Sequence, residues 1–130
     1  MRYMLIILGD ESQFASLSDE ERAANGARWA DYTKELVDSG AFVSGDGLQS
    51  ATTATTLRVD NGERVLTDGP FAETKEQIGG FYLLECDDLD QALEWAKKVP
   101  VRGGGIEVRP VMDYEAAGME EPQAQGAAAS

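Results

Sequence analysis

Two apolar stretches without a polar face constrain the fold of this chain more than any other feature. Arg2–Leu8 and Gly80–Cys86 carry apolar side chains at both odd and even positions, which is typical of strands covered on both faces of a sheet. Each stretch is followed by a helix pattern and then by another strand pattern. The sequence therefore predicts two strand–helix–strand halves within one α+β domain.

The first helix has clear boundaries in the sequence. Ser18 begins the pattern Ser-Asp-Glu-Glu, a capping box in which Glu21 occupies the reciprocal position. Gly40 is typical of the residue that follows a helix, so this helix is expected to end near Ser39. Helical spacing predicts a buried stripe of Ala23, Ala27, Ala30, Thr33 and Val37, widened by Trp29 and Leu36.

A hairpin and a second helix complete the pattern. Asp60-Asn61-Gly62 favours a tight turn, because asparagine and glycine tolerate positive φ, and it joins the β-branched run TTATTLRVD to Glu63–Thr67. Asp87 is expected to cap a second helix that ends near Lys98. The buried side of this helix is predicted to carry Leu89, Ala92, Leu93, Ala96 and Val99. The remaining predicted strands are AFVSGDGL, before the hairpin, and Ile106–Val111, after the second helix.

This order of elements predicts a ferredoxin-like α+β sandwich, in which an antiparallel-rich sheet carries both helices on one face. The other face would still carry apolar side chains from the central strands, and soluble monomers seldom expose an apolar surface of that size. We therefore expect a second copy to cover it, sheet to sheet, with two-fold symmetry. The domain is expected over residues 1–112, and the acidic, alanine-rich residues 113–130 are expected to form a disordered tail.

Charge and residue usage narrow the chemistry. The net charge of −13 predicts that neither nucleic acid nor a membrane is a partner, because both surfaces are anionic. The single cysteine, Cys86, excludes an internal disulfide, indicates a cytoplasmic protein, and is expected to be a packed apolar side chain. The absence of histidine removes the commonest general base, the histidine-dependent nucleophile systems and histidine-ligated metals. We expect no metal and no cofactor.

The motif Asp68-Gly69-Pro70-Phe71 has two interpretations. As a turn, its proline fixes the backbone and Phe71 anchors the loop in the core. As a site, the rigid turn holds the Asp68 carboxylate in a pocket, where Phe71 would contact a ligand. Lys75 is either part of a solvated charged loop or an amine that faces an anionic ligand. The other candidate ligand-binding residues lie on predicted strands, where the alternative role is polarity at an edge or interface: Tyr3, Tyr82 and Arg109.

Segments spread along the chain form a recognisable set: MRYMLIILGDES, LSDEERAA, SGDGLQ, ATTLRV, TDGPFAETKEQIGGFYLLE, DLDQALEWAKKVP and IEVRPV. Together they resemble the YCII-related family, in its DGPF-domain branch, from Met1 to about Met112. The resemblance implies a ferredoxin-like fold that pairs into a dimeric α+β barrel. In the broader family, whose function is largely unassigned, a histidine and an aspartate have suggested enzymatic activity. Asp68 corresponds to that aspartate, and this chain has no histidine to match the other residue.

Two functional hypotheses follow. In the first, an enzyme-like homodimer binds a small organic metabolite in an inter-sheet pocket, with Asp68 as the acid or base. In the second, the chain is a non-catalytic interaction or regulatory module, because the resemblance implies an association of DGPF-type domains with sigma-70-type transcription factors. An acidic surface would suit a basic partner of that kind. A dimer without any pocket is a third alternative.

Overall fold

The computed structural model describes residues 1–72 and 76–123. Its elements, in chain order, are β1 (Arg2–Gly9), α1 (Ser12–Ala15), α2 (Asp19–Ser39), β2 (Phe42–Gly47), the 3₁₀ turn η1 (Ala51–Thr53), β3 (Thr55–Asp60), β4 (Glu63–Asp68), β5 (Gln77–Glu85), α3 (Leu89–Lys98) and β6 (Gly105–Pro110). Every long element lies within a few residues of a predicted one. The short α1 and η1 are not predicted by the sequence pattern.

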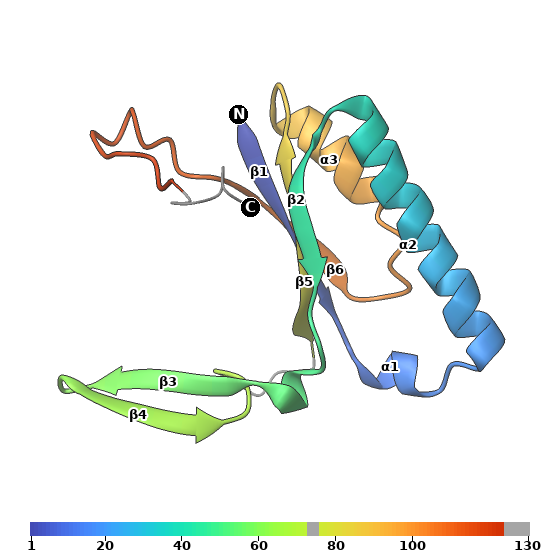
Figure 1. The fold of residues 1–130 in the computed structure, drawn as a ribbon, viewed down its shortest axis with the longest axis horizontal. Helices are drawn as coiled ribbons and strands as arrows, with labels where there is room; N and C mark the ends of the chain where they lie inside the picture. Colours follow the sequence, from blue (N-terminus) through green and yellow to red (C-terminus); the bar gives the residue numbers. More distant parts are fainter. Residues whose placement is uncertain (73–75, 124–130) are drawn as a thin grey trace.

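The four-stranded sheet has the order β2-β5-β1-β6, and each pair of neighbouring strands is antiparallel. The two strands with apolar side chains on both faces, β1 and β5, form its centre. Figure 1 shows both long helices, α2 and α3, on the same face of this sheet. The ferredoxin-like α+β fold expected from the sequence is therefore confirmed.

The core lies between the helices and the sheet. Directly paired residues of an antiparallel ladder point to the same side, so the pairs Tyr3–Leu84 and Leu5–Tyr82 place four side chains toward the helices. All four are buried, and Leu5 and Leu84 have no accessible surface. The remaining buried residues of this core are Tyr32, Leu36, Ala41, Cys86, Ala92 and Val99.

On the opposite face of the sheet, the described residues form no helix (Figure 1). The pairs Met4–Leu83 and Ile6–Phe81 place apolar side chains at its centre, where they are half-buried against one another. At the β6 edge the same face becomes polar, because Met4 also pairs with Arg109. We call this surface the bare face and define it by Met4, Ile6, Phe81, Leu83, Glu107 and Arg109.

The capping of α2 is as predicted, and its buried stripe is predicted only in part. Ser18 and Glu21 form the capping box, and Gly40 ends the helix with a positive φ of 83°. The predicted burial of Leu36 is confirmed, and Trp29 and Thr33 are partly buried. The prediction is wrong for the other four residues, which are exposed: Ala23, Ala27, Ala30 and Val37. The side toward the sheet instead carries Asn25, Trp29, Tyr32, Thr33 and Leu36. Burying the large rings of this set removes more apolar surface from water than burying alanines, which decides the rotation of the helix.

The helix α3 begins at Leu89 with Asp88, and not Asp87, as its cap. The Asp88 carboxylate accepts a hydrogen bond from the Gln91 amide nitrogen at 2.9 Å. The predicted burial of Ala92 and Val99 is confirmed. Ala96 is partly buried against the core, whereas the predicted burial of Leu89 and Leu93 is wrong, because both are exposed.

The hairpin of β3 and β4 forms a separate two-stranded sheet that projects from the domain, on the side away from the helices (Figure 1). Asn61 and Gly62 both have positive φ, so the predicted tight turn is confirmed. Because the hairpin stands apart from the core, several of its apolar side chains are exposed. Those exposed are Leu57, Val59, Val65 and Leu66.

Phe71 does not anchor the loop in the core, as the sequence predicted. Its side chain is 66% exposed, and its ring lies under the guanidinium of Arg58, 4.3 Å from the ring centroid. Arg58 also donates a hydrogen bond to the Phe71 carbonyl oxygen at 2.6 Å. The ring packs on the hairpin because the projecting hairpin carries the loop away from the core.

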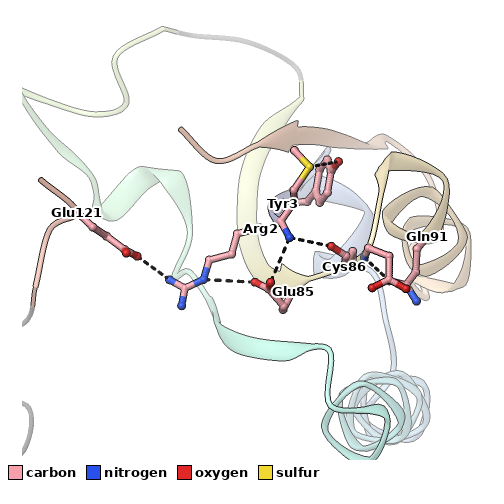
Figure 2. A network of polar contacts seen from close by, with 8 residues as sticks. Arg2, Tyr3, Glu85, Cys86, Gln91 and Glu121 are labelled. Carbon is pink, nitrogen blue, oxygen red and sulfur yellow. Dashed lines mark hydrogen bonds and ion pairs between the residues drawn. The ribbon is translucent and has the colours of Figure 1, made fainter. Parts of the chain in front are cut away.

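The two ends of the described chain meet at one end of the central strands of the main sheet. Figure 2 shows Glu85, at the end of β5, beside Arg2. The Met1 ammonium group lies 3.1 Å from the Glu85 carboxylate. Arg2 also reaches Glu121 at 3.5 Å. Residues 113–119, expected to be disordered, contain a turn closed by a hydrogen bond from the Met119 nitrogen to the Tyr114 oxygen. Residues 124–130 of the predicted tail lie outside the described residues.

Candidate functional site: a cavity between α2 and the sheet

A cavity of about 1060 Å³ lies between α2 and the helix-covered face of the sheet. Its walls come from the end of β1, the middle of α2, the end of β2 and the start of β5. The short helix α1 and the loop Val101–Gly103 close one side of it. Ligand pockets commonly measure about 300–1,000 Å³, so the volume suits a small organic molecule.

The helix wall carries polar side chains where core packing favours apolar ones. Asn25, Trp29 and Thr33 recur at every fourth position of α2 and all line the cavity. The Asn25 Oδ1 atom is buried and has no hydrogen-bond partner among the described residues. The Thr33 Oγ1 and Tyr82 hydroxyl oxygens lie 2.8 Å apart and share a hydrogen bond. We call these groups the Asn25–Thr33–Tyr82 cluster.

The sheet wall is shaped by glycines. Gly45 pairs with Tyr82, and Gly47 pairs with Gly80, which in turn pairs with Ile7, so all of them face the helices. A Cβ on Gly45 would lie 2.8 Å from the Tyr82 ring, whereas a Cβ on Gly47 would meet nothing within 4 Å. The missing side chain of Gly47 therefore contributes directly to the cavity.

The charged residues at the cavity lie at its mouth, and none of them is buried: Asp10, Glu11, Arg22, Asp46 and Arg102. The Glu11 carboxylate accepts hydrogen bonds from the Ser50 hydroxyl and the Ala51 amide, both at 2.7 Å. Ser50 and Ala51 begin η1 at the base of the hairpin, so Glu11 joins the cavity mouth to the hairpin. Asp10 accepts hydrogen bonds from the amide and hydroxyl of Ser12.

Of the predicted site residues that the structure describes, only Tyr82 lines the cavity. Tyr3 is buried in the core, where its hydroxyl donates a weak hydrogen bond to the Met1 sulfur at 3.8 Å. Arg109 lies on the bare face in an ion pair with Glu107 at 2.7 Å. Lys75 lies outside the described residues.

The two DGPF-motif candidates are also apart from the cavity. Asp68 is exposed at the end of β4, where it pairs with Thr55, and Phe71 is exposed beside Arg58. In the single chain, therefore, Asp68, Phe71 and Arg109 do not meet Tyr82 at one site.

Two titratable groups in the core are held neutral. Burial raises the pKa of Tyr32 well above its usual value, and the Tyr32 hydroxyl donates a hydrogen bond to the Trp95 carbonyl oxygen at 2.9 Å. Burial likewise raises the pKa of the Cys86 thiol. Neither group is suited to acid–base or nucleophilic chemistry at neutral pH. Within residues 1–72 and 76–123, no helix has the length and apolar character needed to cross a membrane.

The sequence patterns missed Asn25, Trp29, Thr33 and Gly47 as cavity residues. For the three residues on α2, the available signal was the regular spacing of two uncharged polar side chains around an aromatic one on a single helix face. That spacing also fits a solvated helix face, so it becomes informative only when the rotation of α2 is known.

Comparison with known proteins places this architecture in a family. The model of the YCII-related domain matches residues 1–115, which include all of the sheet and both long helices. An uncharacterised protein of Rhizobium meliloti (strain 1021) is 37% identical over 118 residues, covering 88% of this chain and 95% of the relative. The chain belongs to the YCII-related domain family.

Proposed function

We propose that this protein binds a small organic molecule in the cavity between α2 and the sheet, and that it does so as a homodimer. The observation that carries the proposal is the cavity itself, because aromatic walls and the Thr33–Tyr82 hydroxyl pair meet in a space of about 1060 Å³. Mostly apolar pockets with a few convergent polar groups are the usual sites of small-molecule binding.

The test is a titration with N-phenyl-1-naphthylamine (NPN), an uncharged dye whose fluorescence rises in apolar surroundings. The wild-type protein should bind NPN, and Gly47→Val should bind it at least about tenfold more weakly, because the new side chain grows into the cavity. Gly26→Ala is the matched control, since Gly26 is exposed on α2 and has free space for a Cβ. Equal binding by wild type and Gly47→Val would exclude the cavity as the site.

Two unpartnered apolar surfaces support the homodimer: the bare face and the exposed side chains of the hairpin. They lie on the same side of the molecule, away from the helices (Figure 1). The charges on the bare face balance locally, because Arg109 is paired with Glu107. The net charge of −13 therefore opposes the association of two copies less at this face than elsewhere. Light scattering should give a mass near twice the 14.0 kDa of the chain, and Ile6→Lys should reduce it to the single-chain value.

An acid–base role for Asp68 would depend on this dimer. The pairs Thr55–Asp68 and Leu57–Leu66 place Asp68 on the same face of the hairpin as two exposed leucines. If that face packs on the partner, Asp68 becomes enclosed in an inter-sheet site, where a carboxylate can act on a ligand away from bulk water. Asp68→Asn should then keep the dimer mass and lose any turnover; unchanged turnover would remove Asp68 from the chemistry.

The second candidate function is that of an interaction module for a transcription regulator of the sigma-70 type. The exposed apolar side chains of the hairpin favour it, because contiguous apolar surface on a small protein often marks a docking site. Leu66→Glu should abolish capture of such a partner, whereas Gly47→Val should leave the capture unchanged. The opposite result would favour ligand binding in the cavity.

A further inference from the structure

We infer that the ligand of this cavity is an uncharged, planar aromatic molecule with a hydroxyl, carboxamide or ring N–H group that meets the Asn25–Thr33–Tyr82 cluster. This inference rests on the proposed function and specifies the class of ligand. It combines three observations: the hydrogen-bonding capacity of the cluster, the aromatic walls beside it, and the absence of a buried charge among the described residues.

The cluster can both donate and accept hydrogen bonds. Thr33 and Tyr82 share one hydrogen bond, so one of the two hydroxyl hydrogens remains free, together with oxygen lone pairs. The Asn25 side chain also lines the cavity. Its oxygen has almost no accessible surface, so it reaches a ligand only when the amide rotates, and that rotation exchanges the acceptor and donor ends of the amide. A ligand group that both donates and accepts hydrogen bonds matches the Asn25–Thr33–Tyr82 cluster better than a group that only donates or only accepts them.

The walls next to the cluster are aromatic and flat. Trp29 lies between Asn25 and Thr33 on α2, and its ring is nearly parallel to that of Tyr82, with 6.5 Å between centroids and 11° between planes. Phe42 meets Tyr82 edge-on at 6.3 Å. On the same sheet wall, Gly47 leaves open space beside these rings. A planar ring gains contact with such surfaces and fits between them.

The charges around the cavity oppose a charged ligand. An anion would approach a chain of net charge −13, and the arginines at the mouth, Arg22 and Arg102, are exposed to water. A cation moved to the cluster would meet no buried carboxylate, because none of the described charged residues is buried. Burial of an unpaired charge is strongly unfavourable. The interior therefore favours a neutral molecule.

The test measures displacement of NPN by compounds that share one naphthalene ring. These are 2-naphthol, which is neutral and carries a hydroxyl; 2-methylnaphthalene, which is neutral and makes no hydrogen bond; and 2-naphthoate, which is an anion. In the wild type, 2-naphthol should bind about fivefold to tenfold more tightly than 2-methylnaphthalene, the ratio expected for one good hydrogen bond. The anion 2-naphthoate should bind most weakly of all.

Variants of the cluster assign this preference to named groups. Asn25→Leu and Thr33→Val keep the approximate shapes of the side chains, and the double variant should lower the 2-naphthol preference to less than about threefold. Circular dichroism checks that α2 still forms. As a control, Ser44→Ala changes a hydroxyl on β2 that does not line the cavity, and it should leave the preference unchanged.

The outcomes separate the inference from the proposed function. If 2-naphthoate binds as tightly as 2-naphthol, or the hydroxyl preference survives in the double variant, the inferred class of ligand is wrong and the cavity remains a binding site. If NPN does not bind, or binds equally to Gly47→Val, the cavity is not a site, and both the proposed function and this inference fail.

Discussion

Replacement of Asn25 by leucine should make the protein more stable. The Asn25 oxygen is buried without a partner, and its removal recovers about 1–3 kcal/mol. Leucine is also the better helix former, by a few tenths of a kcal/mol. Together these terms give about 1.4–3.4 kcal/mol, which for a domain of this size raises the melting temperature by roughly 4–14 °C. The adjoining cavity provides room for the leucine methyl groups.

The assay is thermal unfolding followed by circular dichroism, at one protein concentration because dimerisation makes the melting temperature depend on concentration. Gly26→Ala, on the exposed side of the same helix, isolates the effect of helix propensity and should stabilise by about 0.5–1 kcal/mol. A loss of stability in Asn25→Leu, with Gly26→Ala behaving as expected, would refute the reasoning. It would show that the amide is hydrogen-bonded in the folded protein.

Three further predictions concern other parts of the fold. Gly104→Ala should destabilise by at least about 1 kcal/mol in urea unfolding, because Gly104 has a φ of 75° and a Cβ there would collide with the β1 backbone; an unchanged midpoint would contradict this. Hydrogen bonds from Ser18 lower the pKa of Glu21 below 4.5, so its ionised form stabilises the fold above that pH, and the contribution is lost as the pH falls through the folded pKa. Glu21→Gln should therefore have a lower melting temperature than wild type at neutral pH, and the same melting temperature in strong acid. A difference in melting temperature that does not change with pH would count against the capping box. Because burial raises the pKa of Cys86, a disulfide reagent should label it far more slowly in the folded protein than in urea, and equal rates would show that the thiol is accessible.

The order of elements was predictable because its signals are local. The capping box at Ser18, the turn at Asn61 and the apolar strands β1 and β5 each depend on neighbouring residues, and each is confirmed. The rotation of α2 was not predictable, because it depends on which side of the helix meets a sheet built from distant segments. Large rings at Trp29 and Tyr32 outweigh the alanine stripe only when that sheet is present.

The candidate site was less predictable than the fold. Tyr82 was identified as a strand residue with a polar tip, and it does line the cavity. Phe71 was placed wrongly because the sequence does not show that the hairpin leaves the core. Gly47 has no side chain that suggests a function. Its role depends on the cavity beside it, which exists only once the helices and strands have packed together.

The contrast between Gly45 and Gly47 has a consequence for how this scaffold can diversify. Both face the helices from β2, yet any larger residue at Gly45 collides with the Tyr82 ring, whereas the position of Gly47 is open. The fold therefore requires glycine at position 45, whereas the size of the residue at position 47 controls how much space the cavity offers a ligand. A graded series of alanine, serine and valine at position 47 would narrow the space stepwise, so a single codon could retune the choice of ligand while the fold stays the same.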